Sequence, residues 1–270
     1  MHFITISEML GTNGEKISKK VAQELKYPFI GKEELEKAAA EMGLLSDVQK
    51  VDAERNPPLL EKLFSERPKI YVDRMQAVIY EIARKGDALF FGRGSMSLLH
   101  SFNCALHVLV TGSLEKRIET VMEENRVRGE IAEKMIHRSD HDKRAFFRFA
   151  FDEDWLNPRL YDLILNTDKL DIAAATKMII DAANSNEIKE CGSDSLIALG
   201  KLSILRRIEA SLLEIGVHVS VTVEDDLKSV QLYGLVHSQE KRDEIENMLK
   251  KFKEIKSVMD NLTIHPPAAV

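Results

Sequence analysis

Apolar residues along the chain follow two patterns. Short continuous apolar runs alternate with longer segments in which apolar residues recur every three or four positions, which are the spacings of buried strands and of amphipathic helices. The runs expected to form strands span residues 3–6, 88–91, 105–110 and 163–165. Strands that alternate with helices in this way predict an α/β fold with a parallel sheet and helices on both of its faces.

The pattern changes between residues 184 and 195, where polar residues and a glycine replace the apolar repeat. Such a composition predicts a linker. Beyond it, the spacing predicts a helix, a strand in which Val217 to Val223 alternate with polar residues, a partner strand, a second helix and a last strand. We therefore expect a domain at residues 1–185, a linker at 186–195 and a smaller domain of order α-β-β-α-β at 196–267.

Length and composition fit this division. The 270 residues exceed the size of a typical single domain, and 44% hydrophobic with 30% charged residues is a globular composition. The formal net charge of -6 argues against DNA binding, which depends on neutralisation of phosphates by cationic side chains. Any basic site must therefore be local.

The two cysteines, Cys104 and Cys191, are too few for a disulfide framework or a four-cysteine metal site. Their number fits a reducing compartment, and the first eight residues lack the features of a signal peptide, so the expected location is cytoplasmic. His137 and His141 have no partners at metal-ligand spacing. All four side chains are expected to be structural or at the surface, and no metal site is predicted.

A loop with two glycines, Gly11-Thr12-Asn13-Gly14, separates the first strand from the first helix. Backbone N–H groups in such a loop lie at the positive end of the helix dipole and can hold a phosphate, with Lys16 nearby. The full Walker pattern is absent, because no Gly-Lys-Ser or Gly-Lys-Thr follows at the required spacing. From the pattern alone, a tight turn that needs glycine dihedrals explains the loop equally well.

The segment at residues 126–148 is the most basic part of the chain, with seven Lys or Arg residues against four acids. Arginines such as Arg138 and Arg144 can clamp a transferring phosphoryl group, because the guanidinium fork matches phosphate oxygens. A solvated helix face is the alternative explanation. Asp140 and Asp142 are expected to pair with these cations.

Arg93 lies between Gly92 and Gly94, directly after the apolar run at 88–91. Open α/β sheets bind ligands at the carboxyl ends of their strands, so Arg93 is expected to face a cleft, and the two glycines are expected to leave room for a ligand. The alternative is an ordinary turn with an exposed arginine.

These features together resemble the cytidylate kinase-like family, a branch of the P-loop nucleoside monophosphate kinases. The resemblance covers roughly residues 1–183 and is carried by Ile4-Thr5-Ile6-Ser7, Gly11-Thr12-Asn13-Gly14, Pro28-Phe29, Lys32-Glu33, Gly92-Arg93-Gly94, Ala132-Glu133-Lys134, Asp140, Arg144, Trp155, Tyr161-Asp162-Leu163 and Asn166-Thr167. It implies transfer of the γ-phosphoryl group of ATP to a nucleoside monophosphate such as CMP. Mg2+ would bridge the phosphates, and the basic segment would act as a mobile lid.

The resemblance also implies roles for particular residues. The ATP-binding residues would be Gly11, Thr12, Asn13, Gly14 and Lys16, the acceptor-binding residues Arg93 and Arg126, and the catalytic residues Arg138 and Arg144.

Three positions depart from the family pattern. Members usually carry Ser-Arg where this chain has Ser7-Glu8, a more basic or glycine-rich loop where it has Asn13 and Glu15, and an aspartate where it has Gly31. An acid near the phosphates repels them in a cleft of reduced dielectric. A nucleotide-binding sensor with little or no kinase activity is therefore an open alternative.

The C-terminal segment, residues 196–266, resembles a BON domain. The α-β-β-α-β order carries the resemblance, together with residues 217–223, Leu232-Tyr233-Gly234-Leu235-Val236, Ser238, Ile255-Lys256-Ser257-Val258 and Asn261-Leu262-Thr263-Ile264. It implies contacts with lipid surfaces or other proteins. Ten Lys and Arg against eleven Asp and Glu from Leu196 onward argue against purely electrostatic attraction to anionic lipid. Ligand sensing or protein contact is expected, and homo-oligomerisation stays open.

Overall fold

The computed structural model describes residues 2–51, 68–188 and 190–265. Five strands form one parallel sheet in the order β2-β3-β1-β4-β5. Their bounds are β1 Phe3–Glu8, β2 Phe29–Ile30, β3 Ala88–Phe91, β4 Ala105–Thr111 and β5 Leu163–Asn166. β1 lies at the centre between β3 and β4, so its side chains are buried on both faces, which explains its continuous apolar run. The predicted strands and the α/β fold are confirmed.

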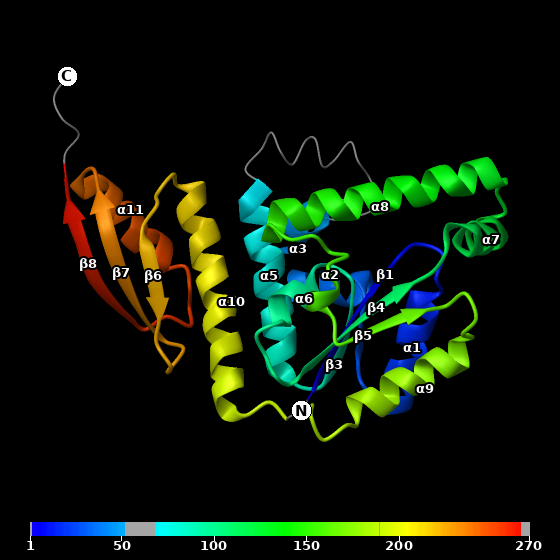
Figure 1. Cartoon of the computed structure of the whole chain (residues 1–270). Helices are drawn as coiled ribbons and strands as arrows, with labels where there is room; N and C mark the ends of the chain where they lie inside the picture. The colour runs from blue at the N-terminus through cyan, green and yellow to red at the C-terminus, as the bar shows by residue number, and fades with distance from the viewer. Residues whose placement is uncertain (1, 52–67, 189, 266–270) are drawn as a thin grey trace.

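Helices cover both faces of this sheet (Figure 1). They are α1 Gly14–Leu25 and α9 Ile172–Ala183 on one face, and α2 Lys32–Glu41, α3 Leu45–Val51, α5 Pro68–Lys85 and α6 Ser95–Leu99 on the other. On the first face Ile4 packs with Ile17 and Ile179. On the second face the core includes Phe3 and Met75. The sheet is therefore the middle layer of three, and its carboxyl edge is left for a site.

Two further helices, α7 Leu114–Asn125 and α8 Gly129–Phe151, cross over the carboxyl ends of the strands (Figure 1). Most of the basic segment at 126–148 is therefore one continuous helix of 23 residues. α8 is held down by apolar side chains on its inner face, among them Ile136, Phe146 and Phe147, which are buried. Most charged residues of the segment are consequently exposed on the outer side of α8, whereas Asp142 is buried and Asp140 and Lys143 are half-buried.

The C-terminal part has the predicted α-β-β-α-β order. Its elements are α10 Ser193–Glu214, β6 Ser220–Val223, β7 Ser229–Val236, α11 Gln239–Leu249 and β8 Ser257–Ile264. β6 and β7 form the expected antiparallel hairpin, and β8 pairs with β7 in parallel. Ile208, Leu232 and Ile245 belong to a separate core. α10 begins at Ser193, so part of the segment expected to be a linker is helical.

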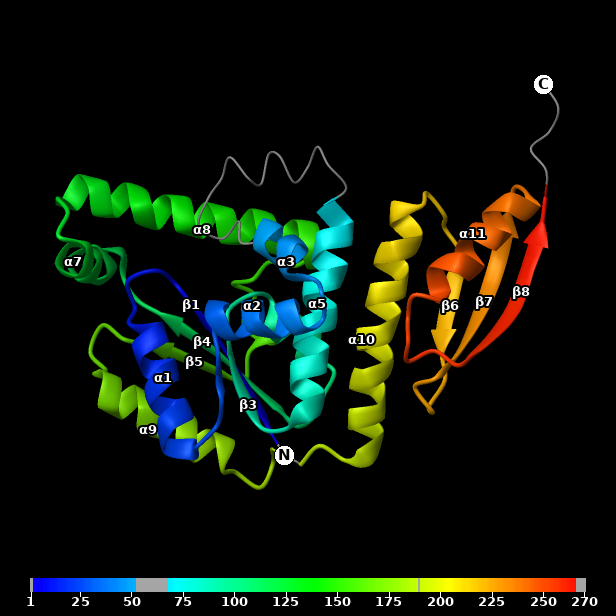
Figure 2. The same ribbon diagram turned by 180° about the vertical axis from the view of Figure 1, so that it is seen from behind.

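α10 lies alongside α5, between the part that contains the five-stranded sheet and the part that contains the three-stranded sheet (Figures 1 and 2). The Ser203 hydroxyl donates to the carbonyl of Ala77 at 3.0 Å, and both residues are buried. A guanidinium nitrogen of Arg206 lies 3.8 Å from Asp73 of α5, whose side chain is only 3% exposed. The C-terminal part is thus attached to the N-terminal part by a helix interface that contains buried polar groups.

Cys104 and Cys191 form a disulfide with a Cα–Cα distance of 5.1 Å, although 87 residues separate them in the sequence. The cysteine count correctly excluded a framework of several disulfides, but no bond between these two residues was expected; they meet because the segment ahead of α10 returns to the start of β4. The cytoplasmic location, which rested partly on the cysteine count, stays a prediction. Within the described ranges, no helix combines the length and the hydrophobicity that crossing a membrane requires.

Candidate functional site

The glycine loop connects the carboxyl end of the central strand β1 to the first turn of α1. Gly11 has φ 89° and Asn13 has φ 59°, so the chain twice enters the left-handed region within four residues. Thr12 is buried, and its hydroxyl donates to the carbonyl of Met9 at 2.8 Å. Asn13 occupies the N-cap of α1, but its side chain accepts no hydrogen bond from a backbone N–H of the first turn. The N–H groups at the start of α1 are therefore available to another acceptor.

The acceptor present in the structure is the side chain of Glu8, the last residue of β1. The N–H of Glu15 donates to Glu8 Oε2 at 3.3 Å. A Cβ at Gly14 would lie 2.7 Å from the same oxygen. Burial raises the pKa of the Glu8 carboxyl above its usual range, and this outweighs the opposite effect of Lys143 and of the loop N–H groups. The Glu8 carboxyl group thus lies at the start of α1, where the sequence analysis expects a phosphate.

Lys143 of α8 brings a positive charge to this point. Its Nζ donates to the backbone carbonyl of Glu8 at 2.6 Å and lies 5.4 Å from the centre of the Trp155 ring. The sequence analysis counted Lys143 in the basic segment but did not single it out. Lys16, which the resemblance placed at the phosphates, instead donates to Asn13 Oδ1 at 3.0 Å and pairs with Glu124 at 2.6 Å.

Arg117 of α7 was also missed as a site residue. Its Nε donates to the carbonyl of Leu10 at 2.8 Å, and its two terminal nitrogens bind the Asp140 carboxylate at 2.9 and 2.7 Å. The expectation that Asp140 pairs with cations of its own segment was wrong, since its bidentate partner comes from α7. Asp142, also expected to pair with those cations, is buried and lies 3.5 Å from His141. One buried arginine therefore connects the glycine loop, α7 and α8.

The other arginines expected at the site lie farther out. Arg126, Arg138 and Arg144 are all exposed, and Arg126 is the left-handed residue that ends α7. Arg138 is two residues from Asp140, or ~200° around the helix, so it projects from the outer face of α8. Arg144 is four residues from Asp140, or ~40° around the helix, and so lies closer to the side that faces the loop.

Arg93 follows β3 at the carboxyl edge of the sheet, as predicted, and has φ 60°. Gly92 and Gly94 also have positive φ, which explains the two glycines as turn residues. A Cβ at Gly94 would lie 2.4 Å from the ring of Phe151. The expectation that Gly94 leaves room for a ligand was wrong, because the end of α8 fills that space.

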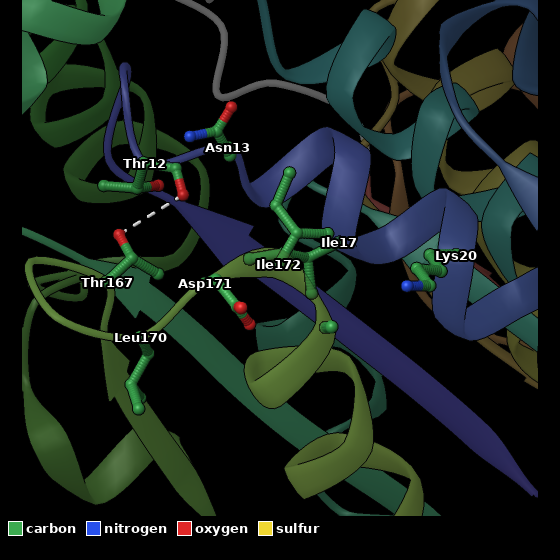
Figure 3. Close-up of a pocket in the computed structure, with 9 residues that line it drawn as sticks. Thr12, Asn13, Ile17, Lys20, Thr167, Leu170, Asp171 and Ile172 are labelled. Atoms are coloured by element: carbon green, nitrogen blue, oxygen red, sulfur yellow. Dashed lines mark hydrogen bonds between the residues drawn. The ribbon is translucent and has the colours of Figure 1, made fainter.

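A pocket of about 600 Å³ opens beside the glycine loop (Figure 3). Thr12, Asn13, Ile17 and Lys20 line it from the loop and α1, and Thr167, Leu170, Asp171 and Ile172 line it from the β5–α9 connection. Thr167 Oγ1 donates to the carbonyl of Thr12 at 3.3 Å, which joins the two walls. The pocket therefore combines an apolar interior with a loop that exposes backbone donors.

The sequence indicated one wall of this pocket, the loop at 11–14, and Thr167 of the other wall, but not residues 170–173. The segment at 170–173 contains two apolar residues directly before and after the N-cap of α9. Asp171 is that N-cap, and its carboxylate accepts from the N–H of Ala174 at 2.7 Å. The usable signal was Leu170, an apolar residue in the otherwise polar loop that follows a strand at the carboxyl edge of the sheet.

Comparisons with known proteins match the chain to one family and to several solved structures. The family model for the cytidylate kinase-like family matches residues 3–169. An uncharacterized protein from Eubacterium ventriosum ATCC 27560 is similar over 69% of this chain and 100% of its own, with 22% identity and a TM-score of 0.52. Shikimate kinase from Bacteroides thetaiotaomicron has 12% identity, coverage of 68% and 99%, and a TM-score of 0.42. Deoxyadenosine kinase from M. mycoides has 13% identity, coverage of 68% and 100%, and a TM-score of 0.37. No curated protein matches the chain significantly.

Proposed function

The chain belongs to the cytidylate kinase-like family, and from this premise we propose that residues 1–185 bind a nucleotide and transfer a phosphoryl group from ATP to a nucleoside monophosphate such as CMP. The observation that carries the proposal is the continuity between the glycine loop and the pocket at the β5–α9 connection. A base can lie against the half-buried Leu170 and Ile172 while its phosphates reach the N–H groups at the start of α1. Apolar walls with a few convergent polar groups are typical of sites for such ligands.

The loop suits the phosphates of ATP, because the N–H of Glu15 at the start of α1 already donates to an acidic side chain there, that of Glu8. Mg2+ would arrive with the nucleotide, since it is bound mostly by phosphate oxygens and water, with one or two protein carboxylates. Among the described residues, no three His, Cys, Asp or Glu side chains gather as a metal site. When bound, the metal would neutralise charge on the phosphates.

Four arginines are proposed to bind the phosphates near this loop. Arg93 and Arg126 are proposed to bind the acceptor phosphate, and Arg138 and Arg144 to stabilise the transferring group as α8 closes. Arg144 needs the smaller movement, since it is nearer to the face of α8 that carries Asp140. Gly11, Thr12, Asn13 and Gly14 form the proposed ATP loop, and Lys16 would have to leave Glu124 to join it.

Calorimetric titration with ATP, followed by a coupled assay of ATP consumption with CMP, dCMP and other monophosphates, tests the proposal. ATP binding together with turnover of at least one monophosphate is the expected result. Failure to bind ATP or any monophosphate would refute it.

A second function is favoured by a specific observation at the loop. Glu8 occupies the anion position and Lys16, the cation that the resemblance assigns to the phosphates, pairs with Glu124 instead, which is unfavourable for phosphoryl transfer. On this view the protein is a nucleotide sensor. Binding of ATP or CMP without turnover of any acceptor would select this function over the transferase.

We also propose that residues 196–267 form a BON-like module that responds to the nucleotide domain through α10. The contact of α10 with α5 supports this arrangement. Tyr233, Leu235 and Met259 are exposed on β7 and β8, which favours a protein partner or a second copy of the chain over an anionic lipid surface. Light scattering with and without ATP would detect a nucleotide-dependent change of assembly.

A further inference from the structure

Glu8 reaches into the glycine loop because the loop has no side chain at residue 14. The Oε2 atom of Glu8 lies 2.7 Å from the position that a Cβ at Gly14 would take, and Glu8 Cβ lies 2.6 Å from it. Any larger residue would expel the carboxylate from the start of α1. The φ of Gly14 lies outside the left-handed region that favours glycine, so the backbone conformation does not require a glycine here. What requires it is the close approach of the Glu8 side chain.

The contact uses the donors that a phosphate would use. The Glu15 N–H donates to Glu8 at 3.3 Å, and hydrogen bonding from the backbone of Gly14 and Glu15 favours the ionised form of the carboxyl. These groups belong to the first turn of α1, whose N–H groups have no partner within the helix. A phosphate and the Glu8 carboxylate cannot occupy them at the same time.

We propose that Glu8 is an internal competitor for the phosphate site, so that a ligand binds the loop only by displacing the Glu8 carboxylate. This inference rests on the proposed function, because it takes the loop to be where phosphates bind. Lys143 makes the exchange feasible, since its ammonium is anchored on the Glu8 carbonyl at 2.6 Å and stays beside the loop when the carboxylate leaves.

Competition of this kind makes the affinity of the loop depend on how much negative charge the ligand carries. A ligand must replace the hydrogen bonds of one carboxylate and also overcome repulsion by the displaced Glu8 and by Glu15, the neighbouring acid. A polyphosphate satisfies more of the loop donors and of Lys143 than a single phosphate does. We therefore expect the loop to prefer a triphosphate over a single phosphate by a larger factor than it would if Glu8 were absent and only the N–H groups bound the ligand.

Titration calorimetry of the full chain with inorganic tripolyphosphate, at one fixed pH and ionic strength, tests the proposal. The variants are Glu8→Ala, which empties the loop, and Glu8→Gln, which keeps the shape and removes the charge. Glu15→Gln is the matched control, because Glu15 is also an acid at the loop but its carboxylate is exposed and bound to Lys19 at 2.9 Å. Thermal melting confirms that each variant is folded.

Both Glu8 variants are expected to bind tripolyphosphate about tenfold more tightly than the native chain, which corresponds to about 1.4 kcal/mol. Glu15→Gln should change affinity by less than about threefold, as expected for an exposed charge. If the native chain binds and the Glu8 variants bind no more tightly, or if Glu15→Gln gains as much, the competitor role is wrong and the proposed function stands. If neither the native chain nor any variant binds tripolyphosphate, the competitor role and the proposed function are both wrong.

Discussion

Arg117 and Asp140 form a bidentate ion pair that joins α7 to α8 directly behind the glycine loop. The two N–O distances are 2.9 and 2.7 Å, and the Arg117 side chain is only 4% exposed. Because Arg117 also donates to the carbonyl of Leu10, the position of the loop and the position of the basic helix depend on the same side chain.

Replacing Arg117 by Ala is expected to lower the free energy of unfolding by about 2 to 4 kcal/mol, because it leaves the Asp140 carboxylate without its partner. The exposed neighbour Lys116, which pairs with Glu119 at 2.7 Å, gives a matched control. Lys116→Ala should cost less than about 1 kcal/mol. Urea denaturation monitored by circular dichroism measures both, and equal effects would show that the buried pair has no special weight.

Replacing Arg144 by Ala is expected to weaken nucleotide binding or turnover by about 1.5 to 3 kcal/mol, the range for hydrogen bonds to charged groups. Arg138→Ala should have the same effect if α8 rotates on closing, and a smaller one if it does not. Arg148→Ala is the control, since Arg148 is an exposed arginine of the same helix. Melting temperatures should stay nearly constant, because exposed arginines add little to stability. A variant with reduced stability and unchanged affinity would assign that arginine to the fold instead.

Replacing Arg93 by Lys is expected to reduce affinity for a monophosphate while leaving affinity for ATP unchanged. The positive charge is kept but the bidentate fork is lost. Lysine meets the same backbone cost at a φ of 60° as arginine does, so the turn itself should persist. Separate titrations with CMP and ATP provide the measurement. A parallel loss of both affinities, or of neither, would remove Arg93 from the acceptor site.

Asp73 makes stability depend on pH at the contact between α5 and α10. Burial raises its pKa from 3.8 to about 6, with a smaller opposing effect of Arg206. The raised value means that the folded protein binds the proton more tightly than the unfolded chain. The ionised carboxyl therefore destabilises the fold above pH 6, and this cost disappears as the pH falls from about 6 toward 3.8.

Asp73→Asn should abolish that dependence and raise the free energy of unfolding by about 1 to 3 kcal/mol above pH 6. Urea unfolding of the native chain and of the variant across this pH range measures the difference, in which other titrating groups cancel. A constant difference between the two proteins would contradict the assignment.

The sequence predicted the fold well because its signals are local. The run at 3–6 is apolar on both faces, as a central parallel strand requires. The alternation at 217–223 predicts a strand, of which only Ser220–Val223 is strand (β6) in the structure. Ser113 directly precedes α7, and its hydroxyl accepts from the Lys116 N–H at 3.4 Å, as is typical of a serine at a helix N-cap. Each of these preferences is set within a few residues.

The candidate site was less predictable because its contacts join distant parts of the chain. Lys143 is one of seven cations in its segment, and nothing along the sequence shows that it reaches Glu8 while Arg138 projects outward. That choice depends on which face of α8 the buried Ile136 and Phe147 turn toward the sheet. The pairing of Cys104 with Cys191 depends in the same way on the path of the chain ahead of α10.

The bond between Cys104 and Cys191 closes a covalent ring around residues 104–191. The ring contains α8 with its cations, β5 and the pocket wall at 170–173. A single proteolytic cut within α8 would therefore leave both fragments linked. On denaturing electrophoresis such a cleaved chain should run as one species without a reductant and separate into two with it.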